Sequence, residues 1–287
     1  MNNPTKKEHY IPQVYLNGFA SDDKRLFFYD LDTYRYSNQM VPVRTICYKN
    51  NLYEYRNSKD EIINSNIIEK ALGLLESLFA KNKNAVKSRI NVVNSHTTNF
   101  LSDEEINFWI VYIAVQILRM PKVIDEISTA ISKIVPSNGD KNLHRNTALF
   151  LLLPFLRELE PDNVEVKIFN EVIDSIGRLQ FTIAFDEQNR LFASDCPLYL
   201  YSPNQRIHDC KNIVFPIDSS LCLLFSENMF ANNTINPIDK DTLEYICKSI
   251  SYSADRRLFR QEKFSKQELY WIRSARNDRL KDNLLCN

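Results

Sequence analysis

The sequence predicts an α+β protein in which a central buried helical layer packs against an antiparallel sheet built from N-terminal and C-terminal strands. Strand-like runs fill the first third of the chain, apolar residues at helical spacing fill the middle, and strands followed by two helices fill the last third. Elements grouped in blocks, without strand–helix alternation, indicate this class. Because no repeat or low-complexity linker divides the 287 residues, we expect a single domain with a strand region at 1–60, a helical region at 61–178 and a strand and helix region at 179–287.

The first strands are expected in the N-terminal region. Arg25–Asp30 and Tyr34–Tyr36 are rich in aromatic residues and flank the polar turn 31–33, which predicts a β-hairpin. Asn51–Tyr55 is predicted to be a further strand, which ends before the polar loop at 57–60.

The middle region is predicted to be helical. Apolar residues recur at helical spacing from Asn66 to Ile90. A second helix should begin after Ser102, because Ser102 and Glu105 form the pattern of a capping box. This helix is apolar on nearly every face, which indicates a central position, and Pro121 should kink or end it.

The remaining elements follow from turn residues and apolar runs. A turn is predicted at 138–140 (Asn-Gly-Asp), followed by a helix from Leu143 to Leu159 that Pro154 interrupts. The C-terminal strands are predicted at Leu179–Phe185, Arg190–Ala193, Ile213–Phe215 and Leu221–Phe225, and the closing helices at Asp241–Tyr252 and Lys266–Leu280.

Composition limits the function. Lysine plus arginine and aspartate plus glutamate both number 36, so bulk charge would not hold the chain on DNA or on anionic membranes. No signal peptide and no apolar run of membrane-spanning length is visible, so we expect a cytoplasmic protein with no membrane partner. The six cysteines form no CxxC pair and are expected to be free thiols, and no glycine falls in a Rossmann or P-loop pattern.

Four segments, taken in order, carry a resemblance to a known family. They are the opening box His9–Phe19 (HYIPQVYLNGF), Gln116–Pro121, Ala193–Pro197 and Phe215–Ile217. The combination resembles the bacterial family known as domain of unknown function 4238, from His9 to beyond Arg257. Members of that family resemble single-gene anti-phage defence effectors, so the resemblance implies antiviral defence without a settled reaction.

The opening box holds three candidate site residues. Pro12–Asn17 is predicted to form a short helix that Gly18 ends, with His9 projecting from the turn before it. Histidine titrates near neutral pH, so His9 suits general acid–base catalysis; the alternative is that it braces the turn. Gln13, four residues on, is assigned to substrate contact. Tyr15 is also assigned to substrate contact, and it belongs to the apolar residues that are expected to anchor the box in the core.

Gln116 and Arg119 lie three residues apart on an otherwise apolar helix. A guanidinium buried there needs an anionic partner, because an unpaired buried charge is costly. One interpretation is that Arg119 binds a substrate phosphate while Gln116 orients the substrate. The other is a buried ion pair of Arg119 with Glu69, Glu76 or Asp195.

Asp195 follows a predicted strand and precedes Cys196-Pro197. It would orient His9 or hold a metal ion; alternatively, its carboxylate caps a turn. The sequence contains no HExxH or other metal-binding motif, so no metal site is assigned and no cofactor is evident. Mg²⁺ is the one cofactor that we consider, held by Glu69, Glu76 and Asp195; otherwise these glutamates are solvated or ion-paired.

Basic and aromatic residues alternate near the C-terminus. The basic residues are Arg256, Arg257, Arg260, Lys263, Lys266, Arg273, Arg276 and Arg279, and the aromatic residues are Phe259, Phe264, Tyr270 and Trp271. Such a segment can steer and stack single-stranded nucleic acid. Because acidic residues lie among the basic ones, an ordinary amphipathic helix is the alternative.

These features together predict an intracellular anti-phage effector that acts on RNA or tRNA as a nuclease. The catalytic set would be His9, Arg119 and Asp195, and the substrate contacts would be Gln13, Gln116 and Tyr15. The alternatives are a non-catalytic sensor that binds a phage protein and an enzyme that processes nucleotides or NAD. The sequence does not indicate the oligomeric state.

Overall fold

The computed structural model divides the chain into two compact units. It describes residues 7–63, 66–90, 98–153, 164–203, 206–228 and 232–285. Unit 1 comprises Met1–Tyr10, Cys47–Ala85 and Asp103–Gly177, and unit 2 comprises Ile11–Ile46, Val86–Ser102 and Arg178–Asn287. Helices and mostly antiparallel strands confirm the α+β class. The units do not coincide with the three predicted regions, and the single domain stays a prediction.

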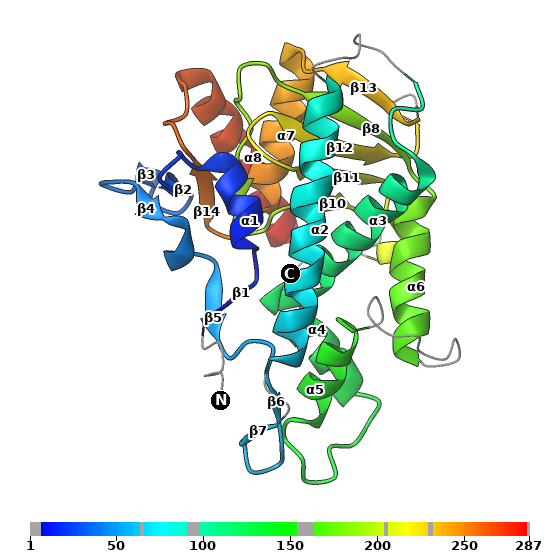
Figure 1. Cartoon of the computed structure of the whole chain (residues 1–287). Helices are drawn as coiled ribbons and strands as arrows, with labels where there is room; N and C mark the ends of the chain where they lie inside the picture. The colour runs from blue at the N-terminus through cyan, green and yellow to red at the C-terminus, as the bar shows by residue number, and fades with distance from the viewer. Residues whose placement is uncertain are drawn as a thin grey trace. The chain divides into compact units, whose positions relative to one another are not determined.

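Unit 1 is mainly helical (Figure 1). Its helices are α2 (Ile67–Ile90, whose last turn belongs to unit 2), α3 (Asp103–Leu118), α4 (Pro121–Ser132), α5 (Leu143–Phe150) and α6 (Val164–Gly177). The first two confirm the helices predicted from Asn66 and after Ser102. Pro121 opens α4, which is bent by 71° from α3. In the part of the chain that the structure describes, no single helix is long and apolar enough to cross a membrane.

Aromatic rings from α2 and α3 form much of the core of unit 1. The ring of Phe79 stacks on that of Tyr112, with centroids 4.7 Å apart, and meets the edge of the Trp109 ring at 5.8 Å. All three side chains are buried. Helix α6 packs against α3, and α5 packs against α4. This packing fixes the C-terminal end of α3, which Arg119 directly follows.

Short strands complete unit 1. β1 (Lys7–His9) pairs with β5 (Tyr48–Asn50), and β6 (Tyr55–Arg56) pairs with β7 (Ile62–Ile63). The strand predicted at Asn51–Tyr55 is wrong. Asn51 has a φ of 52°, in the left-handed region, so the chain turns there and β5 and β6 remain separate strands.

The turn predicted at 138–140 is confirmed. Asn138 and Gly139 both have positive φ, 48° and 87°, as their residue types allow. The helix predicted from Leu143 to Leu159 is α5, which ends at Phe150. Pro154, the predicted interruption, lies outside the described residues.

Unit 2 contains two five-stranded sheets in the part of the chain described. The first has the order β10-β11-β12-β8-β13, and only its β8–β13 pair is parallel. Its strands are β8 (Gln180–Phe185), β10 (Tyr199–Tyr201), β11 (Asn212–Pro216), β12 (Leu221–Ser226) and β13 (Thr234–Pro237). The second consists of β2 (Arg25–Asp30), β3 (Arg35–Tyr36), β4 (Val41–Pro42), β9 (Ala193–Ser194) and β14 (Arg257–Arg260).

The second sheet is the predicted antiparallel sheet of N-terminal and C-terminal strands. β2 forms the expected hairpin with β3, where Tyr29 pairs with Tyr36, and its other edge pairs with β14, where Phe28 lies opposite Phe259. Helices α2 to α6 belong mainly to unit 1 and this sheet to unit 2. The packing of a helical layer against the sheet therefore stays a prediction.

The helices of unit 2 lie at both ends of the chain. The two closing helices are confirmed as α7 (Lys240–Ser253) and α8 (Lys266–Leu285), which pack against each other. The short helix of the opening box is α1 (Gln13–Leu16), followed by the 3₁₀ turn η1 (Asn17–Phe19). Two further 3₁₀ turns are η2 (Val43–Thr45) and η4 (Ile207–Asp209).

Gly18 lies inside the η1 turn, so its predicted role as the cap that ends α1 is wrong. The structure requires glycine there because the backbone passes close to Asp218: a Cβ on Gly18 would lie 2.6 Å from the Cβ of Asp218. We therefore expect Gly18→Ala to lower the free energy of unfolding by about 1–3 kcal/mol, measured by urea denaturation.

Gly73 is the matched control, since it lies within α2 and nothing comes within 4 Å of a Cβ built on it. Gly73→Ala should raise the free energy of unfolding by about 0.5–1 kcal/mol, because alanine favours the helix. Equal effects of the two substitutions would contradict the close approach at Gly18.

Candidate functional site

Arg119 makes internal contacts through all three nitrogens of its guanidinium. Nη1 donates to Glu76 Oε1 at 3.2 Å, Nη2 donates to the main-chain oxygen of His9 at 2.5 Å, and Nε donates to the Tyr53 hydroxyl at 3.3 Å. The Tyr53 hydroxyl in turn donates to the main-chain oxygen of Arg119 at 3.1 Å. Arg119 is only 1% exposed. The predicted buried ion pair is thus confirmed, with Glu76 as the partner.

His9 ends strand β1 and pairs with Tyr48 of β5, so its predicted place in a turn before a helix is wrong. The residue is buried, and its ring lies 5.6 Å from the Tyr48 ring. Arg119 and His9 come together, but through the main-chain carbonyl of His9. An acid–base role of the imidazole stays a prediction.

Four glutamates of unit 1 interact with one another, and we call Glu8, Glu54, Glu69 and Glu76 the glutamate cluster. Glu8 interacts electrostatically with Glu54 and Glu69, and Glu69 interacts with Arg119 and Glu76. Two backbone contacts also hold the cluster: the N–H of Tyr53 donates to Glu8 Oε2 at 2.8 Å, and the N–H of Asn66 donates to Glu54 Oε1 at 3.1 Å. Two arginines interact electrostatically with the cluster, Arg119 with Glu69 and Glu76 and Arg145 with Glu8, so the four carboxyl groups outnumber the arginines.

This environment shifts two of the carboxyl groups. Glu8 is 0% exposed, and burial raises its pKa to about 7, against the lowering effect of the Tyr53 N–H. Burial also raises the pKa of the partly exposed Glu69 to about 7, where Arg119 lowers it and Glu76 raises it further. Both groups can therefore gain and lose a proton near neutral pH.

Three buried polar atoms of this region have no hydrogen-bond partner among the described residues: Glu8 Oε1, Glu69 Oε2 and Gln116 Nε2. Buried polar atoms are normally paired, because an unpaired one costs free energy. Gln116 itself is 1% exposed and lies one helical turn before Arg119. The Glu76 side chain is 28% exposed, so the cluster reaches solvent along one edge of α2.

The model of a protein family described as "Protein of unknown function (DUF4238)" matches residues 7–264. The chain belongs to the DUF4238 family. The matched stretch contains the whole glutamate cluster and Arg119. No curated protein and no solved structure matches the chain.

Glu8 and Glu54 of this DUF4238 protein were missed by the sequence analysis. Glu8 directly precedes the opening box and Glu54 lies in the predicted strand Asn51–Tyr55, and neither was considered as a site residue; β1, which contains Glu8, pairs with β5, about 40 residues later in the sequence. One signal was present: Glu8 directly precedes the opening box, which is rich in apolar residues.

Three predicted site residues lie in unit 2 of the DUF4238 chain. Tyr15 is 1% exposed, its ring stacks on Phe215 at 5.5 Å and its hydroxyl donates to the main-chain oxygen of Pro197 at 3.3 Å. Tyr15 is therefore a core residue. This agrees with its predicted place among the apolar residues of the opening box and does not support the predicted substrate contact. Gln13 is exposed on α1.

Asp195, the third, holds a turn. Its two carboxylate oxygens accept from the backbone N–H groups of Asp255, Arg256 and Arg257, each at 2.9 Å. Burial raises its pKa to about 6, against the effect of these N–H groups. The carboxylate thus fixes the link between α7 and β14, which supports the turn-capping alternative.

The predicted Mg²⁺ ligands divide between the units, with Glu69 and Glu76 in unit 1 and Asp195 in unit 2. Among the residues that the structure describes, no group of three or more His, Cys, Asp or Glu side chains could hold a metal ion.

The basic C-terminal residues are mostly engaged within unit 2 of the DUF4238 protein. Arg256 pairs with Asp30 at 2.7 Å, Arg276 with Asp32 at 3.0 Å, Arg260 with Glu268 at 2.8 Å and Arg279 with Asp255 at 3.5 Å. Three of the four aromatic rings are buried, those of Phe259, Phe264 and Trp271. These contacts favour the amphipathic-helix interpretation over a stacking platform for nucleic acid.

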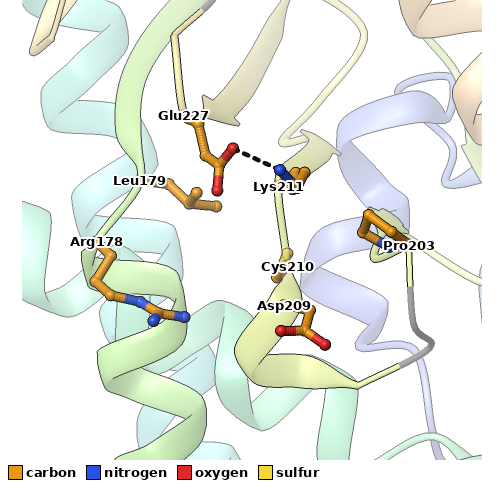
Figure 2. Close-up of a pocket in the computed structure, with 7 residues that line it drawn as sticks. All are labelled: Arg178, Leu179, Pro203, Asp209, Cys210, Lys211 and Glu227. Carbon is orange, nitrogen blue, oxygen red and sulfur yellow. Dashed lines mark hydrogen bonds and ion pairs between the residues drawn. The ribbon is translucent and has the colours of Figure 1, made fainter.

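A polar pocket of about 570 Å³ lies in unit 2, lined by Arg178 and Leu179 before β8, by the η4 turn and by the residues next to β11 and β12 (Figure 2). Lys211 and Glu227 point toward each other at its wall and form an ion pair of 3.1 Å, while Arg178 and Asp209 supply a second cation and anion. Burial raises the pKa of the Cys210 thiol to about 12, so the thiol stays protonated at neutral pH and is a poor nucleophile. Of these sites, the glutamate cluster has the chemistry best suited to proton transfer.

Proposed function

We propose that this protein cleaves RNA by acid–base catalysis at the glutamate cluster and serves as an effector of anti-phage defence. One observation carries the proposal: Glu8 and Glu69 interact with each other, and each has a pKa near 7 and an unpaired carboxyl oxygen among the described residues. A general acid or base is most effective when its pKa lies near the working pH. The anti-phage role rests on the resemblance to the family.

RNA suits such a site because it brings its own nucleophile. A base removes the proton of the ribose 2′-hydroxyl, the 2′-oxygen attacks the neighbouring phosphorus, the bond to the 5′-oxygen breaks, and an acid protonates that leaving oxygen. Glu69, on the more exposed edge, would exchange the proton with the substrate. Arg119 would act as a positioning residue, since its guanidinium nitrogens bind within the protein. DNA has no 2′-hydroxyl and should remain uncut.

The test uses purified protein incubated with total RNA and with plasmid DNA, each with Mg²⁺ and with a chelator. We expect RNA alone to be cut, and Glu69→Gln to lower the rate by about 100-fold or more, because the amide cannot transfer the proton. Thermal unfolding of Glu69→Gln should be unchanged or shifted upwards, because the substitution removes a poorly solvated charge.

Glu126→Gln provides the matched control, since Glu126 is exposed on α4 and pairs only loosely with Lys122, at 3.8 Å. It should leave cleavage unchanged. The proposal fails if wild-type protein leaves RNA intact under both conditions, or if Glu69→Gln cuts RNA at the wild-type rate.

A second candidate, a sensor that binds a phage protein, is favoured by an apolar groove in unit 1. The groove has a volume of about 470 Å³ and is formed by α4, α5 and α6, with Ile131, Ile134 and Ile168 among its lining residues. Ile134 is 82% exposed, which is unusual for isoleucine outside an interaction surface. Loss of phage protection in Ile134→Asp together with full protection in Glu69→Gln would favour the sensor, and the reverse pattern would favour the enzyme.

A further inference from the structure

Arg145 of helix α5 binds the segment of unit 1 that contacts the Glu8 carboxyl. Its Nη2 donates to the main-chain oxygen of Leu52, and its Nη1 donates to that of Glu54 at 3.3 Å. Tyr53 stands between these two residues, and its backbone N–H donates to Glu8 Oε2 at 2.8 Å. Arg145 therefore fixes the stretch of main chain from which Glu8 receives this hydrogen bond.

The charge of Arg145 also acts on Glu8. Burial lowers the pKa of Arg145, the like charge of Arg56 lowers it further, and the attraction of Asp125 and Glu8 opposes both effects. The hydrogen-bond acceptors of the guanidinium are neutral main-chain oxygens, so they do not cancel its charge. Because the attraction is mutual, a positive charge on Arg145 favours the ionised form of Glu8.

We propose that Arg145 is a positioning residue of the glutamate cluster, which holds the Tyr53 N–H against Glu8 and supplies a cation for the ionised Glu8 carboxyl. Its role in catalysis rests on the proposed function, in which Glu8 belongs to the acid–base site. Arg145 acts through Glu8 and does not need to touch the substrate. The sequence analysis did not select Arg145, because its contacts lie about 90 residues away in the chain.

The other titratable groups that face Glu8 come from α2 and from the segment between β5 and β6. They are Glu69 of α2 and the side chains of Glu54 and Tyr53. The two glutamates disfavour the ionised form of Glu8. Tyr53 stays neutral near pH 7, since burial raises its pKa to about 12. Arg145 therefore opposes the effect of the two glutamates.

Helix α5 also provides a matched control residue, Asn146. Its Oδ1 accepts from the N–H of Arg56 at 3.2 Å, and its Nδ2 donates to the main-chain oxygen of Arg56 at 2.7 Å. Asn146→Ala therefore removes two hydrogen bonds between α5 and the same stretch of chain without removing a charge. It separates a loss of packing from an effect on Glu8.

The experiment is an NMR titration of the Glu8 side-chain carboxyl carbon in the full-length protein, with the signal assigned by Glu8→Gln. Arg145→Met should raise the midpoint from about 7 by about one pH unit, because it removes the nearby positive charge. Arg145→Gln should give a similar shift; it keeps an amide donor and so serves if Arg145→Met does not fold. Arg145→Lys keeps the charge and should give a smaller shift. Asn146→Ala should leave the midpoint unchanged.

The pH–rate profile of RNA cleavage is the second measurement. Its limb set by Glu8 should move to higher pH in Arg145→Met and Arg145→Gln by the same amount as the midpoint. The inference is overturned if both variants keep the wild-type midpoint, or if Asn146→Ala shifts it as far as they do. A shifted midpoint with an unchanged profile, or with no cleavage of RNA by the wild type, would support the effect of Arg145 on Glu8 and count against the proposed function alone.

Discussion

Replacement of Arg119 by methionine should lower the free energy of unfolding by about 3–5 kcal/mol. Methionine keeps most of the length of the side chain but removes the donors to Glu76, to the His9 carbonyl and to the Tyr53 hydroxyl. It also removes the positive charge that lowers the pKa of Glu69. The loss should therefore be larger at pH 8 than at pH 5, where the carboxyl groups are more often protonated.

Urea denaturation at both pH values measures the effect. Lys122→Met is the matched control, because Lys122 and Glu126 form an exposed pair at 3.8 Å, and exposed pairs contribute about 0–1 kcal/mol. Arg119→Lys should lower the free energy of unfolding by less than Arg119→Met and by more than Lys122→Met. Lysine keeps the positive charge but lacks the planar guanidinium with its several donors. A loss below about 1 kcal/mol for Arg119→Met would show that Arg119 does not organise the cluster.

Glu8→Gln is expected to stabilise the protein at pH 8, although it alters a fully buried side chain. The carboxyl of Glu8 has a pKa of about 7 in the folded protein, against 4.5 for an ordinary glutamate. Its contribution to stability is therefore fully present below pH 4.5 and is lost as the pH rises through 7. A pKa shift of this size corresponds to a loss of about 3 kcal/mol at most in the free energy of unfolding. Glutamine avoids this loss because its side chain does not ionise as the pH rises.

The free energy of unfolding of wild-type protein and Glu8→Gln should be compared from pH 5 to pH 8. The difference should grow in favour of the variant as the pH rises, whereas the exposed Glu187→Gln should follow the wild type. If Glu8→Gln were less stable than wild type at every pH, the carboxylate form of Glu8 would be the stabilising one, contrary to this account.

Much of the fold follows from local chemistry. Pro121 separates α3 from α4 because it cannot continue a helix, and the aromatic alternation of Arg25–Asp30 identifies β2 and its hairpin. The errors occur where a local pattern yields to a tertiary contact. Asn51 turns the chain inside the segment predicted to be one strand. Glycine is needed at position 18 because the backbone there passes close to Asp218, and not because a helix ends there.

The candidate site was harder to predict, because its contacts join distant segments. The sequence identified Arg119 as a buried cation and included Glu76 among its partners, but it gave no means of choosing among three carboxylates. The bonds from Arg119 to His9 and from Tyr53 to Glu8 span 110 and 45 residues. Local periodicity carries no information over such distances, so Glu8 was missed and the imidazole of His9 was favoured over its carbonyl.

The most direct test of the glutamate cluster is an NMR titration of the glutamate side-chain carboxyl carbons, with Glu8→Gln and Glu69→Gln used to assign the two signals. We expect both signals to titrate near pH 7, because burial raises the pKa of both carboxyl groups. Midpoints below about pH 5 for both would show ordinary glutamates and would contradict an acid–base site in this cluster.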